Sequence, residues 1–209
     1  MRSKLFIVAA LLAALGTSAL ASFACAQAPR GQRVNIRGTI AKLDGQTLTV
    51  KTPDKGTVSV ALAPNYMVRG LVRKQLSDIK PGDFVGTTSV PGKDGKLHAI
   101  EVHFFPANLT LPESQSPWDS TPNATMTNAH VAGVAKAAQD SVLAINYKGS
   151  VAQVIVDKKT VIVAPAPSPG SAADLKPGRA VYVFATKADN GALSAANITV
   201  EKNGVKPPM

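Results

Sequence analysis

Apolar and polar residues alternate with a period of two in several short runs of the chain. In residues 34–40, for example, Val34, Ile36 and Ile40 alternate with polar or small residues. This period places every second side chain on one face of a β-strand, so each run predicts a strand with one buried face. Turn signals such as Asp44-Gly45 lie between the runs and predict hairpins. The first half of the chain thus predicts strands at about residues 34–40, 48–50, 57–62, 84–90 and 97–105.

One short motif occurs twice, as Asp78-Ile79-Lys80-Pro81-Gly82-Asp83 and as Asp174-Leu175-Lys176-Pro177-Gly178-Arg179. Proline presets a φ angle near −65°, and the glycine after it accepts a positive φ angle. Both copies therefore predict a type II turn, and both lead directly into an apolar run that predicts a strand.

The motif belongs to a longer internal duplication. Residues of the same kind recur at an offset of 95 positions before residue 50 and of 96 positions after residue 58. We infer two copies of a unit of about 72 residues, a size typical of small β domains. The matched pairs include Gly38 with Gly133, Leu48 with Leu143, Val58 with Val154, Gly82 with Gly178 and Gly95 with Gly191.

The predicted fold class is all-β, with two tandem small antiparallel β-barrels of the OB or SH3-like kind. Closure removes exposed strand edges, and barrels this small bury little surface alone, so we expect the two to pack together. The expected domains are a signal peptide at 1–28, a first barrel at 29–106, a proline-rich linker at 107–128, a second barrel at 129–202 and a C-terminal tail at 203–209.

The N-terminus has the features of a secretory signal. Arg2 and Lys4 precede an apolar run over residues 5–15, and Ala26-Gln27-Ala28 fits a cleavage site. The run is shorter than the roughly 20 residues that span a bilayer, so we expect export to the periplasm or secretion. An uncleaved anchor and a lipid on Cys25 are the alternatives. Cleavage after Ala28 removes the only cysteine, which excludes thiol catalysis and disulfides in the mature chain.

The charge is basic and unevenly distributed. The whole chain has a formal net charge of +10. Residues 29–106 carry 12 Lys and Arg against 6 Asp and Glu, whereas residues 107–209 carry 9 against 7. A basic half predicts an acidic partner, and the alternative is an ordinary solvated surface. The candidate residues for binding an anion or partner are Arg69, Arg73, Lys74 and Lys80.

The linker contains Trp118, the only tryptophan of the chain, among three prolines. An aromatic residue in such a connection typically packs on a neighbouring barrel and holds the linker in place. Stacking against a peptide or a sugar is the alternative function.

His103, His130 and Met126 are the candidate metal ligands. His98 and His103 are five residues apart in a predicted strand, which places them on opposite faces unless a bulge intervenes. Met126 and His130 share a face of an extended segment but lie roughly 13 Å apart along it. A composite site, with His103 beside His130 or Met126, is the metal hypothesis, and surface histidines are the alternative.

The sequence contains no pattern that indicates an enzyme. It has no G-x-S-x-G, S-x-x-K or H-E-x-x-H motif, and its turn aspartates are explained by local hydrogen bonds. We therefore expect no catalytic residues and no cofactor. Nucleic acid is not the expected partner either, because export makes it scarce and the core takes up most aromatic residues.

Six segments of the chain carry a recognisable pattern, at residues 34–50, 77–82, 101–106, 117–119, 125–129 and 205–209. Together they resemble a family of exported proteobacterial proteins of unknown function, many of which carry the automatic label "metal ABC transporter permease". The resemblance spans essentially the whole mature chain, but the Gly-Glu-Gly-His stretch typical of the family is replaced by Pro112-Glu113-Ser114-Gln115-Ser116. A permease requires several apolar spans, and the mature chain has none. The resemblance implies an OB-like duplicated barrel and supplies no catalytic residues.

The predicted function is that of an exported, non-catalytic binding or interaction protein of the periplasm. Its partner is expected to be a protein or an anionic component of the envelope. The alternative function is that of a periplasmic accessory protein that handles copper or zinc.

Overall fold

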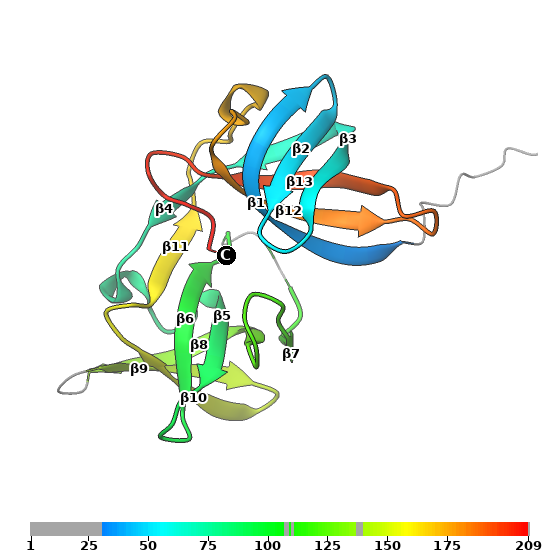
Figure 1. Cartoon of the computed structure of the whole chain (residues 1–209). Helices are drawn as coiled ribbons and strands as arrows, with labels where there is room; N and C mark the ends of the chain where they lie inside the picture. The colour runs from blue at the N-terminus through cyan, green and yellow to red at the C-terminus, as the bar shows by residue number, and fades with distance from the viewer. Residues whose placement is uncertain (1–30, 107–108, 110, 137–139, 209) are drawn as a thin grey trace, which may run out of the picture. The chain divides into compact units, whose positions relative to one another are not determined.

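The computed structural model describes residues 31–106, 109, 111–136 and 140–208, and the expected signal peptide lies outside them. The described residues form an almost entirely β structure, as predicted, with two short 3-10 helices (Figure 1). The strands are β1 (Gln32–Asp44), β2 (Thr47–Thr52), β3 (Gly56–Arg69), β4 (Leu71–Arg73), β5 (Phe84–Pro91), β6 (Leu97–Phe104), β7 (Ser114–Pro117), β8 (Thr125–Lys136), β9 (Ser141–Tyr147), β10 (Ser150–Val156), β11 (Val161–Pro165), β12 (Ala180–Lys187) and β13 (Leu193–Val200). The helices are η1 (Leu76–Asp78) and η2 (Ala172–Asp174).

Two closed five-stranded barrels account for most of the strands, which confirms the predicted fold class. The terminal barrel, so called because it combines both ends of the chain, has the cyclic order β1–β12–β13–β3–β2. The central barrel has the order β10–β9–β8–β5–β6 and closes through a pairing of β10 with β6. In each barrel one neighbouring pair is parallel, β13 with β3 and β10 with β6, and the others are antiparallel. Five strands in this Greek-key arrangement are typical of the OB-fold.

The barrels do not follow the boundaries expected from the duplication. The terminal barrel takes β1, β2 and β3 from the first copy but β12 and β13 from the second. The central barrel takes β8, β9 and β10 from the second copy but β5 and β6 from the first. Figure 1 shows this exchange as blue and cyan strands beside orange and red ones in the terminal barrel. The domains at 29–106 and 129–202 are corrected accordingly: each copy contributes strands to both barrels.

The two connections between the barrels pair with each other. β4 lies antiparallel to β11, with Leu71 opposite Pro165, and Ala166 donates a backbone hydrogen bond of 2.9 Å to Gly70. Pro165, Pro167 and Pro169 follow at alternate positions in the second connection. Because proline lacks an N–H group, another strand cannot pair along these residues. The prolines therefore protect the edge of the ladder.

The repeated motif forms the turn that the sequence predicts. Gly82 and Gly178 have φ angles of 92° and 86°, a region that favours glycine. Each turn also bonds to a strand from the other copy: Gly82 donates to Val131 O at 2.8 Å, and Gly178 donates to Ile40 O at 2.9 Å. The turn at Gly82 therefore aligns β5 with β8, and the turn at Gly178 aligns β12 with β1.

Each barrel has its own core of inward-facing residues. In the terminal barrel, Leu48 and Val60 from the first copy pack with Val181 and Ile198 from the second, and all four are at most 1% exposed. In the central barrel, Val85 and Val102 pack with Leu143 and Val154 in the same way. Since both cores combine both copies, neither copy buries its apolar face by itself.

The offset of the duplication differs from the one expected in the first strand. Ile40 pairs with Val50 and Val131 pairs with Ile145, and each first strand has a bulge directly after that residue. Val131 is thus the counterpart of Ile40, 91 positions away. The expected match of Gly38 with Gly133 is wrong, because 14 positions separate Val131 from its partner Ile145 where 10 separate Ile40 from its partner Val50.

Candidate ligand-binding face

The terminal barrel presents two rows of side chains on the outer face of β1, β12, β13 and β3. The register places Asn35, Phe184, Asn197 and Met67 opposite one another, and we name this set the Phe184 row. The neighbouring set, which we name the Tyr182 row, contains Arg37, Tyr182, Thr199 and Arg69. The residues between the rows, such as Ile36, Val183 and Ile198, point into the core, as the alternation of a strand requires.

Two large apolar side chains of the Phe184 row are exposed. Phe184 is 54% exposed and Met67 is 48% exposed, whereas most large apolar residues of the described chain are buried. Asn35 and Asn197 flank Phe184 in the register, so amide groups alternate with the apolar side chains. A mixed apolar and amide surface of this kind is typical of ligand-binding sites.

At the β1 end of the face, Arg37 lies between two aromatic rings. Its guanidinium carbon is 4.9 Å from the centroid of the Tyr182 ring and 5.4 Å from that of Trp118. The guanidinium also forms an ion pair of 2.8 Å with Asp119, whose carboxylate accepts a hydrogen bond of 3.0 Å from the Asn35 amide. The Arg37 side chain is only 13% exposed. Trp118 thus contacts the terminal barrel through Arg37, in agreement with the expectation that it holds the linker in place.

Tyr182 connects the two rows. Its hydroxyl donates a hydrogen bond of 2.9 Å to Asn35 Oδ1, and its ring meets Phe184 edge-on at 4.7 Å. Burial raises the pKa of the Tyr182 hydroxyl above its usual value near 10. Arg37 opposes that pKa shift, and the carboxylates of Asp119 and Glu101 add to it. The hydroxyl is therefore a neutral hydrogen-bond donor at physiological pH.

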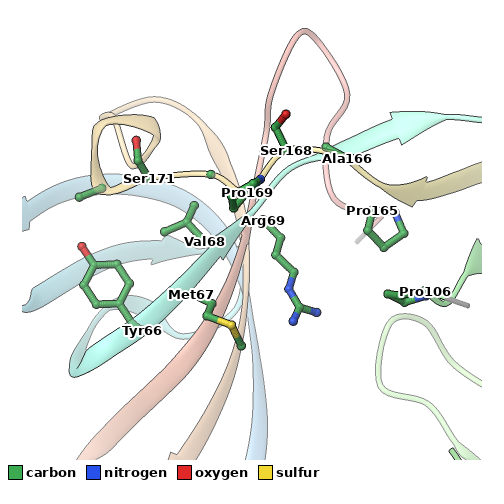
Figure 2. A pocket seen from close by; sticks show the side chains of 12 residues that line it. Tyr66, Met67, Val68, Arg69, Pro106, Pro165, Ala166, Ser168, Pro169 and Ser171 are labelled. Atoms are coloured by element: carbon green, nitrogen blue, oxygen red, sulfur yellow. The ribbon is translucent and has the colours of Figure 1, made fainter. Parts of the chain in front are cut away.

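At the β3 end of the face lies a cavity of about 510 Å³ (Figure 2). Met67 and Arg69 line it from β3, and Pro106 and Pro165 line it from the end of β6 and the second connection. Figure 2 shows the Arg69 side chain extending past Met67 toward these prolines. The lining contains no acidic residue: it consists of Tyr66, Met67, Val68, Arg69, Pro106, Pro165, Ala166, Ser168, Pro169, Gly170, Ser171 and Ala172.

The other predicted basic residues do not join this cavity. Arg73 ends β4 opposite Val163, and Lys74 donates a backbone hydrogen bond to Ile162 O at 2.9 Å. Lys80 lies in the turn before β5. All three side chains are exposed, but only Arg69 of the four predicted residues lines a concave site.

The structure places the three candidate metal ligands on the outer face of the central barrel. His103 lies opposite Gly86, His130 opposite Phe84 and Met126 opposite Thr88. Two phenyl rings separate the histidines: His130 contacts Phe84 at 4.8 Å, Phe84 contacts Phe105 at 5.3 Å, and Phe105 contacts His103 at 4.7 Å. The structure therefore does not bring the three residues together.

Each histidine instead has a glutamate beside it. His103 Nδ1 is 3.2 Å from Glu101, and His130 Nδ1 is 3.7 Å from Glu113. Met126 is 7% exposed, and its sulfur accepts a weak hydrogen bond of 3.9 Å from Thr88. Among the described residues, no three His, Cys, Asp or Glu side chains are grouped so that they could hold a metal ion.

A bulge changes the expected geometry of β6. Thr88 pairs with Glu101 and Ser89 pairs with Ala99, so Ile100 is an extra residue and is 37% exposed. The spacing of Ile100, Val102 and Phe104 predicts that all three share the buried face of the strand. The bulge shows that this is wrong for Ile100, which points away from that face. The same bulge places His98 and His103 on one face, the exception that the alternation rule allows. His98 nevertheless pairs with Asp94 at 3.0 Å, away from His103.

Two further cavities lie elsewhere in the described residues. One, of about 750 Å³, is at an open end of the terminal barrel between Val34, Val58 and Leu193, with Lys55 and Lys187 at its rim. The other, of about 260 Å³, lies beside Phe84, Phe105 and His130. The first carries Asp54 and Asp119 beside its cations, and this mixed lining predicts no single ligand charge.

Phe184, Met67, Tyr182 and Asn35 were not among the residues predicted to bind a partner. The spacing of Tyr182 and Phe184 already places both rings on one face of a strand. Nothing in the spacing of Met67 or Asn35 relates them to those rings, because the alignment arises only when β12 pairs with β1 and β13 with β3.

Comparisons with protein-family models, with curated proteins and with solved structures gave no match. In the described part of the chain, no helix has the length and apolar character needed to cross a membrane. Fold and geometry therefore carry the functional argument, and the family resemblance is an expectation.

Proposed function

We propose that the protein is an exported, non-catalytic binding protein of the periplasm that holds an anionic cell-wall polymer on the Phe184 row and the Tyr182 row. The observation that carries this proposal is the exposure of Phe184 and Met67, 54% and 48%, in one row that also contains two asparagines. Exposed rings stack on the apolar faces of sugars, and amides bond to their hydroxyl groups.

The charges of the face support an anionic ligand. Arg69 lies at one end of the Tyr182 row, and neither row contains an acidic residue. Arg37 is neutralised by Asp119 and serves the attachment of the linker. Residues 29–209 carry 21 Lys and Arg against 13 Asp and Glu, a formal net charge of +8, which favours encounter with an anionic polymer.

Co-sedimentation with purified cell-wall sacculi tests this function. We expect the mature protein to sediment with sacculi and Phe184→Ser to reduce the bound fraction about tenfold, because the substitution removes the stacking surface. Val151→Ser is the matched control, since Val151 is 58% exposed but lies on β10 of the central barrel. Equal retention of both variants, or no retention of the unsubstituted protein, would contradict the proposal.

Export has its own test. Osmotic-shock fractionation of cells that produce the full chain should release the protein with the periplasmic contents, and its N-terminal residue should be Pro29. A cytoplasmic protein that retains Met1 would contradict this part of the proposal.

A further inference from the structure

We propose that the cavity at the β3 end of the face is a binding site for a carboxylate that is attached to an apolar group. The inference rests on the proposed function, because Met67 and Arg69 belong both to the cavity and to the two rows. It names the chemical group that the face binds at its β3 end. Its evidence is the environment of Arg69 and the composition of the walls.

The environment of Arg69 differs from that of the arginines with structural partners. Arg37 pairs with Asp119 at 2.8 Å, and Arg179 lies 3.9 Å from Asp174 and donates to Glu201 O at 3.1 Å. Within the described residues, the Arg69 guanidinium has no ion pair or hydrogen bond, and no acidic residue lines its cavity. A cation in such a setting is complementary to an anion from outside the chain.

The walls of the cavity add an apolar requirement. Arg69 is an exposed residue, and Met67, Pro106, Pro165 and Pro169 line the same cavity, so the walls beside the cation are mostly apolar. Charge-assisted hydrogen bonds are strong in such surroundings, and the planar guanidinium matches a carboxylate with two parallel bonds. Prolines are rigid, and methionine adapts to the shape of an apolar ligand.

The size of the cavity fits a small ligand group. Its volume of about 510 Å³ lies in the range of sites that hold small molecules. The hydroxyl-bearing residues Tyr66, Ser168 and Ser171 also line it and supply a few polar groups in mostly apolar walls. A free carboxylic acid and a carboxylate carried on a polymer present the same chemistry to this site.

Ligand-observed NMR with the mature full-length protein tests the site. The probes are phenylacetate and phenylacetamide, which have nearly the same shape but differ in charge. We expect phenylacetate to bind with a dissociation constant of about 1 mM and phenylacetamide to bind at least about tenfold more weakly. Inorganic phosphate, which has charge but no apolar part, should not displace phenylacetate at equal concentration.

Two pairs of variants locate the effect. Arg69→Gln should weaken phenylacetate binding about tenfold, whereas Arg73→Gln should change it less than about twofold, although both remove one charge. Arg69→Lys should be intermediate, because lysine keeps the charge but loses the paired geometry. Ala172→Phe, which fills the cavity from η2 without a change of charge, should abolish binding. Circular dichroism of each variant verifies that the fold is intact.

Several results would overturn the inference: equal affinity for the acid and the amide, equal loss in Arg69→Gln and Arg73→Gln, displacement by phosphate, or no saturation below about 20 mM. Failure of phenylacetate binding together with retention on sacculi that depends on Phe184 would remove the carboxylate site and leave the proposed function. Phenylacetate binding without such retention would refute the proposed function and leave the carboxylate site. If phenylacetate also releases the protein from sacculi, the carboxylate belongs to the polymer; if not, it belongs to a free acid.

Discussion

The backbone N–H of Ala166 donates a hydrogen bond of 2.9 Å to the carbonyl oxygen of Gly70, and these two residues occupy equivalent positions in the two copies of the duplicated unit. A bond between equivalent positions is expected where two copies of a segment cross each other. The bond marks the place where the chain passes from one barrel to the other. Beyond it, β5 and β6 of the first copy join the central barrel, and β12 and β13 of the second copy join the terminal barrel.

Designed disulfides test this exchange. Arg33 on β1 lies opposite Thr186 on β12, and opposite residues on antiparallel strands are close enough for a disulfide. Residues 29–209 contain no cysteine. In a protein that begins at Pro29, Arg33→Cys with Thr186→Cys should therefore give a disulfide within the monomer under mild oxidation. Mass spectrometry with a thiol label would detect it.

The control exploits the duplication. Val90 occupies the position in the first copy that Thr186 occupies in the second, and it pairs with His98 in the central barrel. Arg33→Cys with Val90→Cys should therefore keep two free thiols. A disulfide in this control and not in the first variant would show two contiguous barrels without exchange.

The contacts of Arg37 predict a large effect of its removal on stability. Arg37→Gln loses the ion pair with Asp119 and the contacts with the Tyr182 and Trp118 rings, and we expect the free energy of unfolding in urea to fall by about 2 kcal/mol. Trp118 emission should shift to longer wavelength as the linker detaches. Lys42→Gln on the same strand, which loses only an exposed pair with Asp44, should cost less than about 0.5 kcal/mol. Similar losses in the two variants would contradict the role of Arg37.

Acid should remove a specific contribution of Asp174. The backbone N–H of Ser171, and to a lesser degree Lys202 and Arg179, lower the pKa of Asp174 below 3.8. A lowered pKa in the folded state means that the carboxylate stabilises the protein above pH about 4 and that this stability is lost as the pH falls through the folded pKa. Asp174→Asn should therefore lower the free energy of unfolding by about 0.5–1 kcal/mol at pH 7, and the difference should shrink as the pH falls below about 4.

The first copy supplies the control for Asp174. Asp78 accepts the equivalent backbone hydrogen bond from Gln75 at 2.9 Å but forms no ion pair within the described residues. Asn can accept this bond as well as Asp, so Asp78→Asn should be nearly neutral at pH 7. A loss at pH 7 as large as that of Asp174→Asn would show that Lys202 and Arg179 do not contribute.

Alkaline pH should destabilise the protein through Tyr182. Burial raises the pKa of this hydroxyl in the folded state, so the folded protein holds the proton more tightly than the unfolded chain does. The stability is thus unchanged below pH about 10 and falls as the pH rises above that value. Tyr182→Phe should lose about 1 kcal/mol at pH 7 with the hydrogen bond to Asn35 but should depend less on pH above 10. An equal slope in both proteins, measured by urea unfolding between pH 9 and about 11.5, would contradict this assignment.

The fold class was accessible from local pattern, and the connectivity was not. Alternation at Val34 and Ile36, and the glycine of the repeated turn, each act within a few residues and predicted the strands and turns correctly. Local pattern does not determine the partner of β1, because β5 and β12 carry similar patterns and either one is compatible with pairing to β1. Tertiary contacts such as the bond between Gly70 and Ala166 decide between them.

The candidate sites were predicted in part. The sequence indicated Arg69 as a basic residue, but its cavity depends on Pro106 and Pro165, which are distant in sequence. The Phe184 row was not predicted for the same reason: strands from different copies place Phe184 and Met67 in one row. The bulge at Ile100 reversed the expected faces of β6, since a single extra residue shifts the alternation for every residue that follows.

The exchange of strands also has a consequence for inheritance. Neither copy of the duplicated unit is a module that recombination could transfer to another protein, because a chain cut within the linker would separate β1 from β12 and β8 from β5. Substitutions in β12 are selected for their fit to β1, which lies in the other copy. The two copies must therefore diverge as complementary partners, and a loss of either one would leave both barrels open.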